Sequence, residues 1–300
     1  MKQLLLTTLC VLTFSLSMTA QITINRADFG ISSTVRDSAV VKNLTKTGAT
    51  LPTFGNNQNW DYSALKDSLA DLGTRYYAPP ASFGTVPTVF SDANVAANYN
   101  TTFQAFSYPS RAYLKSDATG FNQLGYATNG RAFSITPISG GATDSLIFTA
   151  AITRYTNPNI FYKFPITANS VWKSNFKDTS NFLLTIAAFG LNRTPGARVS
   201  AYTQTDTIMG WGTLKMRNPT GGASLSYAVL LDRNIVTTVD SFYLAGGPAP
   251  AALLGAFGLT QGSSSGTPAT YAFLGIGFKQ PFMVIATDAA GRIDFVSRGV

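Results

Sequence analysis

Short segments in which polar and apolar residues alternate recur along the chain, separated by clusters of Gly, Pro, Asn and Ser. Alternation with a period of two is typical of strands that bury one face, and the intervening clusters are typical of turns. The pattern predicts an all-β fold, either an antiparallel β-sandwich or a partly closed β-half-barrel, with little helix. The predicted strands are Gln21–Arg26, Thr101–Tyr108, Gly120–Ala127, Arg131–Ile138, Ser145–Tyr155, Ile160–Phe164, Asn181–Phe189, Arg198–Ile208, Ser224–Leu231 and Ile235–Leu244.

The C-terminal residues contain the clearest hairpin pattern. Phe282–Thr287 and Arg292–Ser297 are strand-like and flank a short turn sequence that ends in Gly291. Only two segments favour a helix: Tyr62–Leu72, with leucines at helical spacing, and the Ala/Leu-rich Ala251–Leu259.

The first twenty residues have the layout of a secretory signal peptide. Lys2 supplies the positive charge, an uncharged apolar run extends from Leu4 to Leu16, and Ala20 is the small residue at the cleavage point. The run is shorter than the roughly 20 residues that cross a bilayer. We therefore predict export, cleavage after Ala20, and a periplasmic, outer-surface or extracellular location. Residues 21–300 contain no further segment that is long and apolar enough to span a membrane, and no linker or repeat, so they are predicted to form a single β-rich domain.

The composition narrows the possible chemistry. The chain contains no His and no Glu, all 14 acidic residues are Asp, and the single cysteine, Cys10, lies inside the predicted signal peptide. These absences exclude a Ser-His-Asp triad, a Cys-His pair, a histidine-ligated zinc site and glutamate-based glycosidases. The sequence therefore predicts a non-enzymatic protein without a cofactor or metal. A second interpretation is a carbohydrate-active hydrolase with two aspartates, which requires two carboxyl groups about 5–10 Å apart in one cleft beside an aromatic side chain.

The formal net charge is +8. Basic residues occur singly along the chain, from Arg26 through Lys115 and Lys173 to Arg298, and form no basic run. Nucleic-acid binding is typically accompanied by clustered Lys and Arg. We therefore predict a solvated basic surface and no nucleic-acid partner.

Residues 241–278 carry no charge at all and include an apolar stretch. This segment has two interpretations: a lid over a hydrophobic ligand, or a long connection whose apolar side chains pack onto the core, which we favour. Tryptophans likewise either stack on a ligand or fill the core, and core packing is favoured. The candidate ligand-binding residues are Leu253, Leu254, Phe257, Leu259, Trp172 and Trp211.

A short pattern, Asp-Ser or Asp-Thr followed by an apolar residue, recurs along the chain. The candidate hydroxyl residues within it are Ser38, Ser68, Ser145 and Thr207. The pattern resembles the O-glycosylation acceptor of exported Bacteroidetes proteins, and it predicts modification at one or more of these sites. Asp-Ser is also ordinary turn chemistry, so the unmodified alternative stays open.

Four further segments resemble one group of proteins when they are taken together. They are Ile22–Phe29, directly after the signal peptide, Gly55–Leu65 (GNNQNWDYSAL), Gly210–Leu214 (GWGTL) and Val229–Arg233 (VLLDR). The arrangement resembles exported β-rich proteins of Bacteroidetes, in which such a body often precedes a C-terminal sorting domain for type IX secretion. Because the sequence stops at Val300, just after the predicted hairpin, we expect the body without that domain. The group has no established activity to carry over. The missing catalytic residue types, the β-rich pattern and this resemblance together predict a surface, structural or binding module, whose partner is unknown and has two candidates, a hydrophobic ligand and a surface glycan.

Overall fold

The computed structural model describes residues 21–299, so the predicted signal peptide lies outside the described residues. The all-β prediction is confirmed: these residues form one large, mainly antiparallel sheet that is not closed into a barrel. The strands are β1 (Asp37–Leu44), β2 (Gly55–Tyr62), β3 (Asp67–Ala78), β4 (Val95–Phe103), β5 (Phe106–Asp117), β6 (Gly120–Thr128), β7 (Arg131–Ser134), β8 (Ser145–Phe148), β9 (Ala151–Lys163), β10 (Val171–Ile186), β11 (Leu191–Met216), β12 (Leu225–Leu244), β13 (Gly247–Pro248), β14 (Ser263–Leu274), β15 (Met283–Thr287) and β16 (Ile293–Gly299).

Helical structure is limited to short segments in the connections. These are the α-helices α2 (Thr136–Ser139) and α3 (Ala251–Ala256) and the 3₁₀ helices η1 (Arg26–Asp28), η2 (Pro80–Phe83), η3 (Thr88–Phe90) and η4 (Ala187–Phe189).

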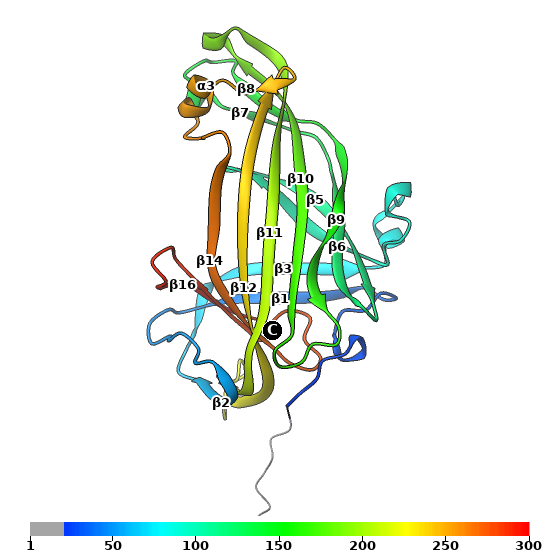
Figure 1. Cartoon of the computed structure of the whole chain (residues 1–300), viewed down its shortest axis with the longest axis vertical. Helices are drawn as coiled ribbons and strands as arrows, with labels where there is room; N and C mark the ends of the chain where they lie inside the picture. The colour runs from blue at the N-terminus through cyan, green and yellow to red at the C-terminus, as the bar shows by residue number, and fades with distance from the viewer. Residues whose placement is uncertain (1–20, 300) are drawn as a thin grey trace, which may run out of the picture.

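The sheet bends into two layers that cross at a steep angle (Figure 1). The front layer contains β10, β11, β12 and β14, which run along the long axis of the molecule; β1 and β3 cross behind them, and β4, β5, β6 and β9 continue the sheet as the back layer. The strand order is β7-β8-β10-β11-β12-β14-β15-β16-β1-β3-β4-β5-β6-β9, with β13 paired to β12 and β2 paired to β11.

The last strand of this order, β9, returns to lie beside β10. Side-chain hydrogen bonds join the two strands: the Asn157 amide donates to the carbonyl of Asn175 over 3.1 Å, and the Ile160 N–H donates to the hydroxyl of Ser174 over 3.3 Å. The described residues show no backbone ladder between β9 and β10. The two layers therefore meet along the β9–β10 side and enclose an interior there, although no backbone ladder closes the sheet between these strands.

Strand β10 shows how the sequence produces this arrangement. Trp172, Ser174 and Phe176 are buried on the inner side, whereas Lys173 and Asn175 between them are exposed on the outer side. This alternation places one set of side chains against the back layer and the other set in water.

Buried apolar side chains form three main clusters, which we call the central, lower and upper cores. The central core lies between the layers, the lower core lies between the front layer and β2, and the upper core lies beneath α3. Burial of each large side chain contributes about 1.5–3 kcal/mol. Representative residues are Phe29, Phe121 and Phe278 (central), Trp60, Leu231 and Phe273 (lower), and Phe103, Phe148 and Leu253 (upper).

Three of the segments that carry the sequence resemblance pair with one another. β2 runs parallel to the lower end of β11, with Gly55 opposite Gly210 and Trp60 opposite Leu214. On its other edge, the same part of β11 pairs antiparallel with β12, where Gly210 lies opposite Leu231. β2 thus continues the sheet where the β10–β11 ladder ends.

Several local predictions were wrong. The strand predicted over Gln21–Arg26 is reduced to an isolated bridge at Ile24 followed by η1, and the strand predicted over Arg131–Ile138 ends at Ser134 before α2. The strand predicted over Ser145–Tyr155 is two strands, β8 and β9, whereas Ser224–Leu231 and Ile235–Leu244 belong to one strand, β12.

The helix predicted over Tyr62–Leu72 is absent, because this segment contains the end of β2 and the start of β3. The single strand predicted over Thr101–Tyr108 is interrupted by a hairpin turn in which Gln104 has a φ of 51°. A left-handed non-glycine residue leaves no recognisable turn signature in the sequence.

Other local predictions are confirmed. The C-terminal hairpin forms between β15 and β16, and a helix, α3, occupies Ala251–Ala256 within the predicted segment. Within residues 21–299, no helix is long and apolar enough to cross a membrane.

Candidate functional site

The sheet opens between β3 and β4. These strands are paired at only two positions, Tyr77 with Ala97 and Ala78 with Ala96, and they diverge beyond them. A groove of about 620 Å³ lies where they part, and we call it the β3–β4 groove. Its lining residues are Val41, Gly73, Thr74, Arg75, Asn98, Tyr99, Asn100, Gln280, Val284, Phe295 and Ser297.

The groove continues into an inner pocket of about 110 Å³ between the layers. Arg75, Asn98, Tyr99 and Gln280 line both spaces. Deeper in, the pocket is lined by aromatic and aliphatic residues, and the Gln280 amide donates a hydrogen bond of 2.6 Å to the hydroxyl of Tyr77. The two spaces form one concave site with a polar entrance.

The entrance offers the neutral amides of two asparagines beside the guanidinium of Arg75. Asn98 and Asn100 are exposed, and each carries an amide that both donates and accepts. Burial raises the pKa of the Tyr77, Tyr99 and Tyr162 hydroxyls, which therefore remain protonated near neutral pH. The described lining residues of both spaces include no carboxylate.

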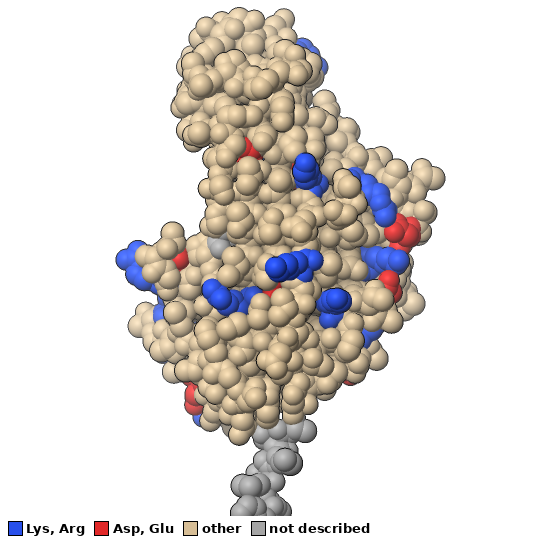
Figure 2. All heavy atoms as spheres, viewed as in Figure 1, with Lys and Arg blue, Asp and Glu red and all other residues tan. Residues whose placement is uncertain are grey.

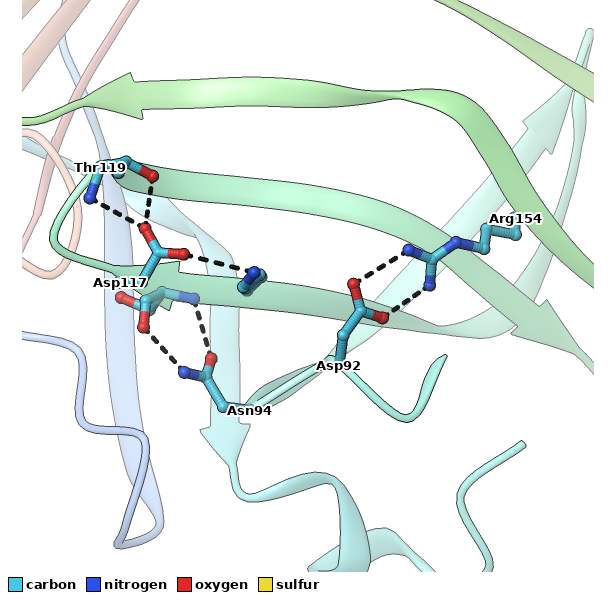
Figure 3. A network of polar contacts seen from close by, with 7 residues as sticks. Asp92, Asn94, Asp117, Thr119 and Arg154 are labelled. Carbon is cyan, nitrogen blue, oxygen red and sulfur yellow. Dashed lines mark hydrogen bonds and ion pairs between the residues drawn. The ribbon is translucent and has the colours of Figure 1, made fainter. Parts of the chain in front are cut away.

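A polar network holds the start of β4, the strand that carries Asn98, Tyr99 and Asn100, in position (Figure 3). Asn94, directly before β4, donates to the carbonyl of Ser116 over 2.7 Å and accepts the Ser116 N–H over 2.8 Å. Nearby, Arg154 of β9 forms two hydrogen bonds to the Asp92 carboxylate, of 2.7 and 3.0 Å. These contacts anchor residues 92–94 to the back layer. The part of β4 that carries Asn98 and Tyr99 therefore begins at a position fixed by hydrogen bonds.

Two buried carboxyl groups lie on the inner side of the front layer. Asp206 is 3% exposed and accepts hydrogen bonds from the amides of Gln204 (2.8 Å) and Asn234 (2.7 Å). Asp232 is also 3% exposed, and its Oδ1 has no hydrogen-bond partner among the described residues. Burial raises the pKa of Asp206 to about 6 and raises that of Asp232 well above its ordinary value, with the Asp206 charge adding to the second shift.

A third inner carboxyl group belongs to Asp178 of β10. The Tyr126 hydroxyl donates to it over 2.5 Å, and burial raises the pKa of Asp178 above its ordinary value. Burial and the Asp178 charge together raise the pKa of Tyr126. This hydrogen bond connects β6 to β10 across the interior.

The apolar candidates from the uncharged segment come together beneath α3. Leu253 and Leu254 are 3% and 5% exposed, and with Phe257 and Leu259 they line an apolar pocket of about 40 Å³ in the upper core. The space holds little more than one or two water-sized groups. The segment itself comprises the end of β12, then β13 and α3, and the whole of β14.

The tryptophan candidates lie elsewhere. Trp172 is 4% exposed in the central core, and its Nε1 has no partner among the described residues. Trp211 is half-buried and packs against the same core. Neither contacts the pocket beneath α3, so the sequence candidates do not form one site.

The four predicted glycosylation residues all lie within strands: Ser38 on β1, Ser68 on β3, Ser145 on β8 and Thr207 on β11. Ser38 is exposed and the other three are half-buried. Their modification remains a prediction.

None of the residues that line the groove was among the site residues predicted from the sequence. One signal was available: Asn is disfavoured in strands, yet Asn98 and Asn100 flank Tyr99 in the middle of β4. The divergence of β3 from β4, which makes these residues a groove wall, depends on long-range pairing.

The fold and site together define an all-β protein whose large sheet is not closed into a barrel and carries a polar groove at an opening between two of its strands. No family model matches the chain, and comparisons with curated proteins and with solved structures find no match either.

Proposed function

We propose that this chain is an exported, non-enzymatic β-protein that binds a carbohydrate in the β3–β4 groove. The observation that carries the proposal is the groove itself, whose 620 Å³ falls within the range typical of small-molecule sites. Export follows from the predicted signal peptide.

The lining chemistry favours a carbohydrate. Sugar hydroxyl groups both donate and accept hydrogen bonds, and the amides of Asn98, Asn100 and Gln280 do the same. Tyr99 adds an aromatic ring with a polar hydroxyl at the junction of the groove and the inner pocket. The described lining residues include no carboxylate. Their charged members are Arg75, which lines both spaces, and Lys279, which lines the inner pocket and pairs with Asp37, so a polyhydroxylated ligand meets no negative charge there.

Binding without hydrolysis is favoured by the position of the aspartates. A glycosidase places two carboxyl groups on either side of the scissile bond. Asp206 and Asp232 lie close to each other, but neither is among the residues that line the groove or its inner pocket. A sugar in the groove would therefore not contact this pair.

The pocket beneath α3 supports a carrier of hydrophobic molecules less well. Its volume of about 40 Å³ is far below the roughly 300–1,000 Å³ of typical ligand sites. A lipid chain would require α3 to move away from the upper core.

Isothermal titration of the mature protein with neutral trisaccharides of glucose, xylose and N-acetylglucosamine tests the proposal. We expect at least one to bind, with affinity reduced about tenfold or more by Tyr99→Ala, which corresponds to roughly 1.4 kcal/mol. Tyr99→Phe keeps the ring and should retain most of the affinity. The double variant Asn98→Ala/Asn100→Ala should also weaken binding.

The matched control is Asn181→Ala/Asn192→Ala, which removes two exposed amides at the upper end of β10 and β11. This control should bind as the wild type does. Failure of all three sugars to bind, or equal losses in both asparagine pairs, would overturn the groove assignment.

A further inference from the structure

The acidic residues of β10, β11 and β12 share one face of the sheet, and Arg198 of β11 lies on that inner face with them, opposite Ser180 and Phe242. All four acidic residues of these strands point to the inner side. Asp178, Asp206 and Asp232 are 9%, 3% and 3% exposed, and Asp240 accepts a hydrogen bond of 2.5 Å from the buried Ser200. The outer side of these three strands consequently carries no carboxylate.

Three basic residues of these strands lie on that outer side. Lys173 and Lys177 of β10 are exposed, and Arg233 of β12 is half-buried and lies opposite Thr207. No ion pair within residues 21–299 joins any of the three to a carboxylate. Figure 2 shows Lys and Arg side chains spread across the middle of this face, over the front strands, with only a few Asp atoms visible beside them.

Neutral hydroxyl groups fill the space between these cations. Thr203, Thr205 and Thr207 alternate with inward residues on β11, so they lie on the outer side at intervals of about 7 Å. By strand rise, Lys173 and Lys177 are about 13 Å apart, and Arg233 lies two strands, or about 10 Å, across the sheet. The face thus places hydroxyl groups within a triangle of positive charges.

We propose that this outer face docks the protein onto an acidic polysaccharide. The unpaired cations complement carboxylate or sulfate groups along such a chain, and the threonine hydroxyls complement its sugar hydroxyls. The proposal is independent of the β3–β4 groove, whose lining residues include none from β10, β11 or β12.

Other polyanions fit this face less well. Single-stranded nucleic acids are bound largely by stacking on aromatic side chains, and the residues between the three cations are Thr and Asn. A membrane surface requires a contiguous apolar area, but the exposed Val171 and Val239 stand about 20 Å apart by strand rise.

The test uses the mature protein and immobilised dextran sulfate, with unsubstituted dextran as the reference surface. We expect binding to dextran sulfate in excess of any binding to dextran through the β3–β4 groove, and we expect only this excess to be salt-sensitive. The triple variant Lys173→Gln/Lys177→Gln/Arg233→Gln should bind about tenfold more weakly, as expected for three exposed charge contacts. Because Arg233 is half-buried, the double variant Lys173→Gln/Lys177→Gln is measured as well and should show a smaller loss.

The matched control removes the same charge from exposed bases outside the front layer: Arg36→Gln/Lys66→Gln/Arg131→Gln. This variant should bind dextran sulfate as the wild type does. Equal losses in both triple variants would attribute binding to net charge and overturn the proposal. Stronger binding to phosphatidylglycerol vesicles or to single-stranded DNA than to dextran sulfate would overturn the choice of a polysaccharide.

Discussion

Asp206 of β11 and Asp232 of β12 are buried on the same inner face of the sheet, two positions apart in register: Asp206 lies opposite Asn234, and Asp232 lies opposite Ile208. The hydrogen-bond partners of Asp206 are neutral amides, and Asp232 Oδ1 has no partner among the described residues. The two carboxyl groups therefore oppose each other's ionisation in a region of low dielectric constant.

This relationship predicts a stability that falls as pH rises. A pKa of about 6 for Asp206 in the folded protein exceeds its ordinary 3.8, so the folded state holds the proton more tightly than the unfolded state. The stabilisation is fully present below pH 4 and is lost as pH rises through about 6, on the order of 3 kcal/mol for Asp206 alone. Urea denaturation at a series of pH values measures the loss.

Asp232→Asn tests the same pair by mutation. The amide cannot ionise, so this variant should be more stable than the wild type at pH 8 and similar to it at pH 4. Asp294→Asn, at an exposed carboxyl group, should leave the wild-type pH profile unchanged. A wild-type stability that does not fall between pH 4 and pH 8 would contradict the assignment.

Gly212 allows β2 to approach β11. A Cβ atom at this position would overlap the carbonyl oxygen and backbone of Gln58 in the parallel strand. Gly212→Ala should therefore separate β2 from the sheet and expose part of the lower core, lowering the free energy of unfolding by about 2–4 kcal/mol. Chemical denaturation checks the value.

Gly255 of α3 is the matched glycine, because an added Cβ meets nothing within 4 Å and its φ is ordinary. Gly255→Ala should leave stability unchanged or raise it by up to about 1 kcal/mol through helix propensity. A Gly212→Ala protein as stable as Gly255→Ala would show that the close approach is unnecessary.

Leu253 tests whether α3 is a structural cover. Its side chain is 3% exposed against the upper core, so Leu253→Ala should cost about 2–5 kcal/mol of unfolding free energy. Leu225→Ala, at a leucine that is 37% exposed, should cost less than about 1 kcal/mol. Similar small losses in both variants would mean that α3 is loosely held and would revive the lid interpretation.

Much of the fold follows from local sequence. Alternation in β10 and the turn before Arg292 lead to the correct fold class and the correct C-terminal hairpin. Strand length and pairing are less accessible: β11 extends over Leu191–Met216, more than twice the predicted Arg198–Ile208. The parallel pairing of β2 with β11 joins residues some 150 positions apart, and no local pattern encodes such a register.

Dependence on long-range strand pairing also explains which site residues could be predicted from the sequence and which could not. Leu253 and Leu254 were found from their composition, because an apolar stretch in an uncharged segment must be buried somewhere. Tyr99 and Gln280 meet at the groove only because β3 and β4 diverge, and Lys173 and Arg233 share a face only because β10, β11 and β12 pair. These basic residues are far apart along the sequence, and only the pairing of the three strands brings them onto one face.

Carbohydrate binding in the β3–β4 groove is the central claim, and native mass spectrometry of the protein purified from its own cell envelope tests it most directly. The account predicts a population carrying a non-covalent saccharide, lost on denaturation and missing from the Asn98→Ala/Asn100→Ala variant. A bare polypeptide, or a bound hydrophobic molecule that survives this double substitution, would contradict it.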